Sequence, residues 1–182
     1  MNFVASMGAT AGVLVLVMSG YHHLRHPHSL SDALFAHGVR SKVLRIGMSS
    51  GVSVIEVTLA VLAFVAVWRV QPAVAVTFAI IAALFAVYSL YAIWLLTARP
   101  ESSCGCSGHE YSVNLWVPLR AAALSGASAV TALGAHHVFA SSHPYESVIS
   151  VIAGAAWGFA LWVLPDAMAE PMRSPVELVH EL

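Results

Sequence analysis

Two cysteines separated by one glycine are the residues of this chain best suited to chemistry. Cys104 and Cys106 follow a long apolar stretch, and they are the only cysteines among the 182 residues. A single intervening glycine lets the backbone bend far enough for the sulfurs to bond, in a small ring whose strain raises its reduction potential. The basic groups of Arg99 and His109 lie nearby in sequence and favour the reactive thiolate. The pattern predicts a pair that exchanges oxidising equivalents with another thiol.

Two other interpretations of this C-x-C pair stay open. The pair could be a structural disulfide, or two inert thiols in a tight turn. Alternatively, Cys104, Cys106 and His109 offer three donors that suit zinc or copper. A closed zinc site needs four ligands, so a distant histidine would have to complete this set. A second group of histidines stands at another membrane edge, namely His22, His23, His26 and His28.

Two ionisable residues interrupt apolar segments and need a partner or a cavity, because a charge inside a bilayer costs several kcal/mol. Glu56 stands about ten residues into the second segment, and Arg120 stands near the start of the fourth. Glu56 could exchange a proton during two-electron chemistry at a quinone pocket formed with Tyr88, Tyr91 or Trp94. It could equally be a satisfied polar group that fixes the helix register. An ion pair between Glu56 and Arg120 is a third possibility.

Composition identifies the solvent around this chain as lipid. Hydrophobic residues make up 59% of the sequence and charged residues only 9%, compared with about 25% charged residues in a soluble domain. The net charge of −1 and the scattered Lys and Arg side chains provide no basic surface for nucleic acid. We therefore expect an integral membrane protein that binds no nucleic acid.

Five segments are long and apolar enough to cross a bilayer about 30 Å thick. The first has no basic region before it and no cleavage pattern after it, so we expect a retained helix. Since lipid offers no hydrogen-bond partners, all five should be helices. The expected fold is an all-α, polytopic bundle with a four-helix core plus a fifth C-terminal helix. The predicted spans are approximately residues 3–20, 46–68, 72–97, 117–139 and 148–164, the last ended by Pro165 and Asp166.

The connections between these spans carry most of the polar residues. The stretch 21–45 has apolar residues at near-helical spacing (Leu30, Ala33, Leu34 and Val39), which predicts a short helix lying on the bilayer face. Its basic residues, counted with Arg99 and Arg173, outnumber the single Arg69 of the opposite side. By the tendency of basic loops to stay in the cytoplasm, the charge count predicts an external N-terminus and cytoplasmic cysteines.

The C-x-C segment and its surroundings resemble the methylamine-utilisation MauE family, within the MauE/DoxX group of redox-associated membrane proteins. The resemblance rests on the CGCSG segment from Cys104, on the LWVPLR segment that ends at Arg120, and on the small apolar residues that follow. Ser107 stands where an aromatic residue is common. The resemblance covers about residues 3–140. It implies a role in forming or supplying disulfides to exported redox proteins beside a thioredoxin-like partner, with extracytoplasmic cysteines, contrary to the charge count.

We therefore predict a multi-pass protein of the bacterial plasma membrane that exchanges thiols and disulfides through Cys104 and Cys106, supported by His109, Arg120 and Glu56. With one cysteine pair, the chain must pass electrons directly to a quinone or to a partner protein. The expected organisation is a core over residues 1–140, with the C-x-C loop at 99–116, and a fifth helix and tail over residues 141–182. The alternatives are a non-enzymatic subunit that anchors a membrane complex, and a zinc- or copper-binding module.

Overall fold

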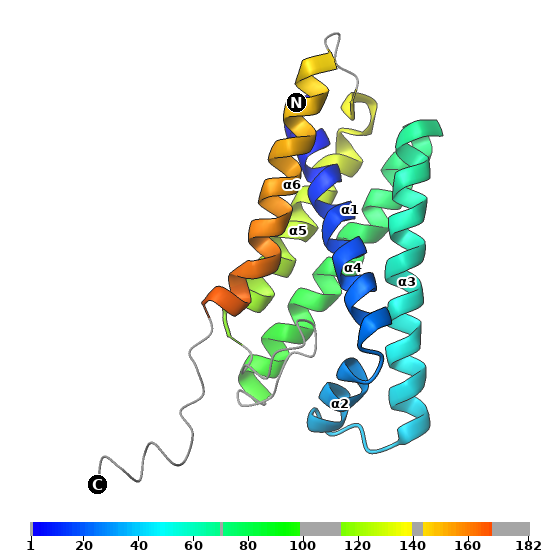
Figure 1. Cartoon of the computed structure of the whole chain (residues 1–182), viewed down its shortest axis with the longest axis vertical. Helices are drawn as coiled ribbons and strands as arrows, with labels where there is room; N and C mark the ends of the chain where they lie inside the picture. Colours follow the sequence, from blue (N-terminus) through cyan, green and yellow to red (C-terminus); the bar gives the residue numbers. More distant parts are fainter. Residues whose placement is uncertain (1, 70, 99–113, 140–143, 169–182) are drawn as a thin grey trace, which may run out of the picture.

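The computed structural model describes residues 2–69, 71–98, 114–139 and 144–168, and these residues form a helical bundle without strands. The expected all-α fold is confirmed (Figure 1). The helices are α1 (Asn2–Arg25), α2 (Ser29–Ala36), α3 (Lys42–Arg69), α4 (Gln71–Ala98), α5 (Trp116–Leu133) and α6 (Pro144–Ala167), with a 3₁₀ turn η1 (Ala135–His137) after α5.

Four of the described helices, α1, α3, α4 and α6, are long and apolar enough to cross a membrane. Helix α5 has 18 residues and is richer in small and polar side chains. It nevertheless carries the chain from the end of the bundle where α4 stops to the end where α6 begins (Figure 1). The chain is thus a multi-pass membrane protein in which α5 returns through the bundle.

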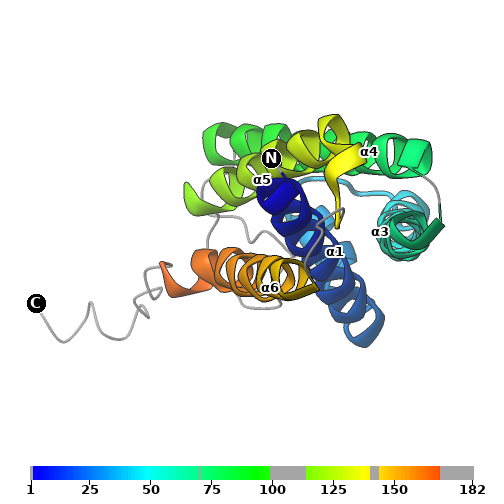
Figure 2. The same cartoon turned by 90° about the horizontal axis from the view of Figure 1, so that it is seen from above.

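Helix α1 occupies the middle of the bundle and packs against α3, α5 and α6. Seen along the bundle, α4 and α5 lie side by side on one flank of α1, and α6 lies on the other (Figure 2). Leu16, Phe78, Ile81 and Leu124 are fully buried in the core between them. Large apolar side chains cover the outer faces of the helices, as expected where the surrounding solvent is lipid.

Glycines bring α1 and α6 into close contact. A Cβ atom added to Gly154 would lie 2.5 Å from the backbone oxygen of Met7, and one added to Gly158 would lie 3.0 Å from the Cα atom of Ala11. Gly154 and Gly158 are one helical turn apart, so they form a flat strip on which α1 rests. Small residues at such contacts are the usual means of close helix packing in membranes.

Three predicted helix ends were wrong. Helix α1 continues to Arg25 rather than ending near residue 20, because polar side chains are tolerated where a helix leaves the lipid and no breaker occurs before Pro27. Helix α5 ends at Leu133 rather than near residue 139, since Gly134 caps it and the 3₁₀ turn follows. Phe139 then adopts a positive φ of 52°, which no helix contains.

Helix α6 continues through Pro165 to Ala167, although we expected this proline to end it at residue 164. The missing N–H of Pro165 removes one helical bond, to the carbonyl of Leu161, and only two more residues follow in the helix. The side chain of Asn114 donates a hydrogen bond of 3.0 Å to the Pro165 carbonyl. A carbonyl that the helix itself leaves without a partner is thereby satisfied.

The predicted short helix after the first span is present as α2, which packs against α3 and buries Ala33 and Leu34. It is followed by His37, whose ring nitrogen Nδ1 lies 2.7 Å from the hydroxyl of Tyr91 on α4. His37 is buried. This contact fastens the connection between α2 and α3 to the transmembrane part of the bundle.

Candidate functional site

Glu56 lies halfway along α3 and is among the most deeply buried side chains of the bundle, with 2% of its surface exposed. Its carboxyl accepts a hydrogen bond of 2.8 Å from the Ser19 hydroxyl and one of 3.0 Å from the Tyr88 hydroxyl. The Nε2 atom of His23 lies 3.6 Å from the same carboxyl oxygen that Ser19 contacts. We call Glu56, Ser19, Tyr88 and His23 the carboxyl cluster.

Three helices supply the carboxyl cluster, so it forms only when the bundle is assembled. Ser19 and His23 are four residues apart and therefore share one face of α1. Gly20 lies between them, where a Cβ atom would come within 2.9 Å of Val57 on α3. The glycine thus lets α1 approach α3 closely enough for the side chains of α1 to reach Glu56.

His23 provides a second buried polar group beside Glu56. Its side chain is 4% exposed, and its Nδ1 atom is buried without a hydrogen-bond partner among the described residues. The ring centroid of His22 lies 5.8 Å from that of His23, and the ring of His26 lies 5.0 Å from that of His22. A row of titratable rings thus leads from the buried carboxyl to exposed His26 at the end of α1.

Arg120 lies within electrostatic range of Glu56, and within the described part of the chain it contacts α6. Its Nη1 atom donates to the Trp162 backbone oxygen at 3.4 Å, and its guanidinium carbon lies 5.5 Å from the centre of the Trp162 ring. The structure therefore gives Glu56 hydroxyl and imidazole neighbours, while Arg120 holds an indole of α6. The direct Glu56–Arg120 ion pair that we considered is not among the contacts of the described residues.

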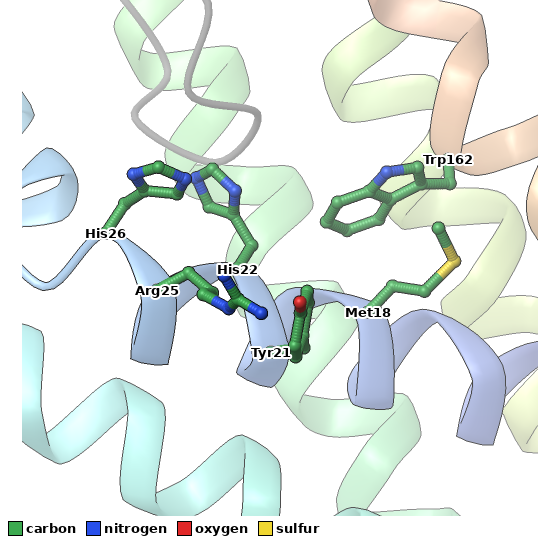
Figure 3. A pocket seen from close by; sticks show the side chains of 6 residues that line it. All are labelled: Met18, Tyr21, His22, Arg25, His26 and Trp162. Carbon is green, nitrogen blue, oxygen red and sulfur yellow. The ribbon is translucent and has the colours of Figure 1, made fainter.

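One pocket of the described part of the bundle lies beside this indole, between the end of α1 and α6. It has a volume of about 310 Å³ and is lined by Met18, Tyr21, His22, Arg25, His26 and Trp162. The Trp162 side chain extends from α6 toward His22 on α1, and the rings of His22 and His26 stand next to each other (Figure 3). We call this pocket the α1–α6 cleft.

Cys104, Cys106 and His109 lie outside the described residues, as does Arg99. The structure does describe the two residues between which their segment is attached. Ala98 ends α4, and Asn114 precedes α5 at the same end of the bundle as the last turns of α1 and α6 (Figure 1). Asn114 is held there, because its amide donates to Pro165 and its Oδ1 accepts from the Trp116 backbone N–H at 3.1 Å.

The other aromatic candidates on α4 have separate surroundings. Tyr88 belongs to the carboxyl cluster, whereas Tyr91 contacts His37 and stacks on Trp94 with ring centroids 5.7 Å apart. Trp94 is 48% exposed on the outer face of α4. The structure therefore brings only the first of the three suggested aromatic residues to Glu56.

No three His, Cys, Asp or Glu side chains within the described ranges are arranged to hold a metal ion. The early histidines belong to this part of the chain, and His23 turns inward to Glu56 while His26 is exposed. A metal site built on the C-x-C segment therefore stays a prediction, because the residues of this segment lie outside the described ranges.

Sequence reasoning singled out Glu56 and Arg120 but not their partners Ser19 and Trp162. It grouped His23 with its neighbours as a metal candidate rather than with Glu56. The spacing of Ser19 and His23 was a usable signal, since two polar residues four apart on an apolar helix mark one face. Nothing in the spacing indicated that this face meets Glu56, which lies 37 residues beyond Ser19.

Comparison with known proteins gives a family for the chain. Residues 1–134 match the family model described as methylamine utilisation protein MauE. The match spans α1 to α5, and it contains the carboxyl cluster, Arg120 and the C-x-C segment. No curated protein and no solved structure gives a significant match. Since the matched region covers well over half of the sequence, this chain belongs to the MauE family of membrane proteins.

Proposed function

We propose that this protein is a membrane thiol-disulfide redox protein that supports disulfide formation in an exported partner through Cys104 and Cys106. The observation that carries the proposal is the carboxyl cluster. A carboxyl held at mid-bundle by two hydroxyl donors, with a histidine beside it, is costly to place in a membrane unless it has a function. The cluster lies in a MauE-family chain whose C-x-C segment is attached at the neighbouring end of the bundle.

The exchange step requires two thiols of the partner and the Cys104–Cys106 disulfide. A partner thiolate attacks one sulfur, and a mixed disulfide forms as the S–S bond breaks. The second partner thiolate then releases the pair as two thiols. Two electrons pass from the partner to Cys104 and Cys106, and the two protons released by the partner are taken up by the cysteines. An acceptor outside the chain must then remove two electrons and two protons, because the sequence contains no second cysteine pair.

Within this cycle we assign Glu56 and His23 to proton movement. Each reoxidation of the cysteines liberates two protons, and the row formed by Glu56, His23, His22 and His26 contains titratable groups from mid-bundle to the exposed end of α1. Arg120 serves as a positioning residue through its contact with Trp162. The bacterial plasma membrane is the compartment that fits a protein serving exported partners.

Trapping of the mixed disulfide tests this function. In cells carrying Cys104→Ser or Cys106→Ser, the remaining thiolate should attack the disulfide of an oxidised partner, which is the reverse of the proposed exchange. The mixed disulfide should accumulate, because the chain lacks the second thiol that would complete this reverse step. Acid quenching, then alkylation of the free thiols at neutral pH, non-reducing electrophoresis and mass spectrometry would detect the adduct. The double serine variant is the matched control and should form none. Normal disulfide content in the exported partners of cells with the double variant would reject the proposal and favour an anchoring subunit.

Labelling in intact cells tests the side of the membrane. After mild reduction, a membrane-impermeant maleimide should modify Cys104 and Cys106 if they act on exported partners. Single cysteines introduced at Ser41 and at Ser147, which lie at opposite ends of the bundle, calibrate the two sides. Labelling of the native pair only after the cells are opened would place the cysteines in the cytoplasm, as the basic residues predict, and would contradict exchange with an exported partner.

A further inference from the structure

The α1–α6 cleft has the chemical character of a site for a flat carbonyl compound. Trp162 and Tyr21 provide aromatic surface, and Met18 provides a polarisable apolar one. His22, His26 and Arg25 supply side-chain nitrogens that can donate hydrogen bonds. The volume of about 310 Å³ lies at the lower end of the range for small-molecule sites.

Charge argues against a phospholipid headgroup as the ligand. Sites for anionic lipids gather several Lys or Arg side chains, whereas Arg25 is the only one among the six residues that line the cleft. The guanidinium carbon of Arg25 also lies 5.2 Å from the centre of the Tyr21 ring, so this ring already covers one face of the guanidinium group. Of the other basic residues at this end of the bundle, Arg45 lies 4.7 Å from the ring of Phe35, on the side of α2 and α3.

The position of the cleft connects it with the proposed redox chemistry. Trp162 lies one turn before Pro165, whose carbonyl binds Asn114, the residue that directly follows the undescribed C-x-C segment. On the other wall, His22 lies next to His23, which contacts Glu56. The cleft is thus bordered by the attachment point of the cysteine segment and by the row of titratable groups.

We propose that the α1–α6 cleft binds the ring of a quinone, which accepts the electrons of the reduced cysteine pair. This inference rests on the proposed function, because it names the acceptor that function requires. In the step, the two S–H bonds of Cys104 and Cys106 break and one S–S bond forms. The two electrons and two protons convert the quinone to the quinol. Trp162 and Tyr21 contact the ring, and His22 and His26 donate hydrogen bonds to a carbonyl oxygen.

Direct binding tests the site without relying on turnover. The full-length protein in phosphatidylcholine nanodiscs is titrated by calorimetry with a short-chain ubiquinone and with a short-chain naphthoquinone. Trp162→Ala and His26→Ala should each weaken binding by about tenfold or more for at least one of the two. Because His26 is exposed, its replacement does not threaten the fold. Phe159→Ala, three residues before Trp162 and 56% exposed, is the matched control and should bind as the wild type does.

Three outcomes would overturn the assignment. The first is wild-type affinity in both cleft variants, and the second is loss of binding in Trp94→Ala instead, which would move the quinone to the outer face of α4. The third is absence of quinone binding together with retention of phosphatidylglycerol that depends on Arg25, which would make the cleft a lipid site. The Cys104→Ser/Cys106→Ser variant should still bind quinone. Binding by this variant together with failed trapping would reject the proposed function and the electron transfer from the cysteines, and would leave only a quinone-binding site. Trapping without quinone binding would reject this inference and leave the proposed function standing.

Discussion

Replacement of Glu56 by glutamine separates the two roles that a buried carboxyl can have. Glutamine has the same shape and keeps an oxygen that accepts hydrogen bonds, but it cannot take up or release a proton at physiological pH. If Glu56 only fixes the helix register, Glu56→Gln should leave the redox cycle nearly unchanged. If Glu56 moves protons, reoxidation of Cys104 and Cys106 should slow strongly while the bundle remains folded.

The contacts in the carboxyl cluster set the expected magnitudes. Glu56 accepts bonds from Ser19 at 2.8 Å and from Tyr88 at 3.0 Å, and hydroxyls can turn to donate to or accept from an amide. Hydrogen bonds between membrane helices contribute about 0.6 kcal/mol on average and at most about 1.7 kcal/mol. Weakening both bonds should therefore cost Glu56→Gln about 1 kcal/mol. Proton transfer by a positioned side chain contributes about 10²-fold to 10⁴-fold to a rate, so the slowing should be at least about 10²-fold.

The assay follows free thiols in membrane vesicles that retain their own electron acceptors. The cysteine pair is reduced, the reductant is removed, and samples are alkylated at intervals and weighed by mass spectrometry. Ser19→Ala is the matched control, because it removes one hydrogen bond of the same carboxyl and should lose similar stability. Its rate should stay within about threefold of the wild type. Unfolding in mixed micelles provides the free energies.

A Glu56→Gln rate within about threefold of the wild-type rate, in a folded protein, would refute the proton-transfer reasoning and make the carboxyl a structural group. Slow reoxidation in both Glu56→Gln and Ser19→Ala would also refute the proton-transfer reasoning, because Ser19→Ala retains the carboxyl. A solvent deuterium isotope effect that is present in the wild type and changed in Glu56→Gln would support the role.

Three further predictions concern the contacts that hold the bundle. Gly154→Ala should destabilise the protein by about 1–3 kcal/mol in micelle unfolding, because the new Cβ would lie 2.5 Å from a backbone oxygen of α1. Gly51→Ala is the control and should be neutral or stabilising, because the space around Gly51 is open. Tyr91→Phe removes the 2.7 Å contact with His37, so hydrogen exchange of the α2 amides should become faster while exchange in α6 stays the same. Unchanged exchange in α2 would contradict an anchoring role for this contact. Asn114→Ala removes two hydrogen bonds before α5 and should speed exchange at the first turn of that helix, and equal protection in both proteins would count against it.

The sequence alone determined the solvent, the fold class and the family. Low charge and long apolar segments indicate a membrane protein. Helices follow from this, because a backbone surrounded by lipid must satisfy its hydrogen bonds internally. The C-x-C pair with the LWVPLR segment was specific enough to indicate the MauE family, which the match over residues 1–134 confirms. Helix ends were less predictable, since Pro165 and the polar end of α1 are tolerated only because of their surroundings.

Only the tertiary structure decided which side chains meet. Glu56 needs a partner, because an isolated charge in the bilayer is costly, and the sequence contains Arg120 and several tyrosines as candidates. The bundle joined it to Ser19, His23 and Tyr88 and directed Arg120 to Trp162 on α6. Hydrophobic periodicity reveals which face of a helix is buried, but the choice of partner depends on crossing angles and on the small residues that let helices approach. Crossing angles and close helix contacts are properties of the packed bundle. A single sequence therefore shows which polar groups need a partner, but only the tertiary structure shows which partner each group has.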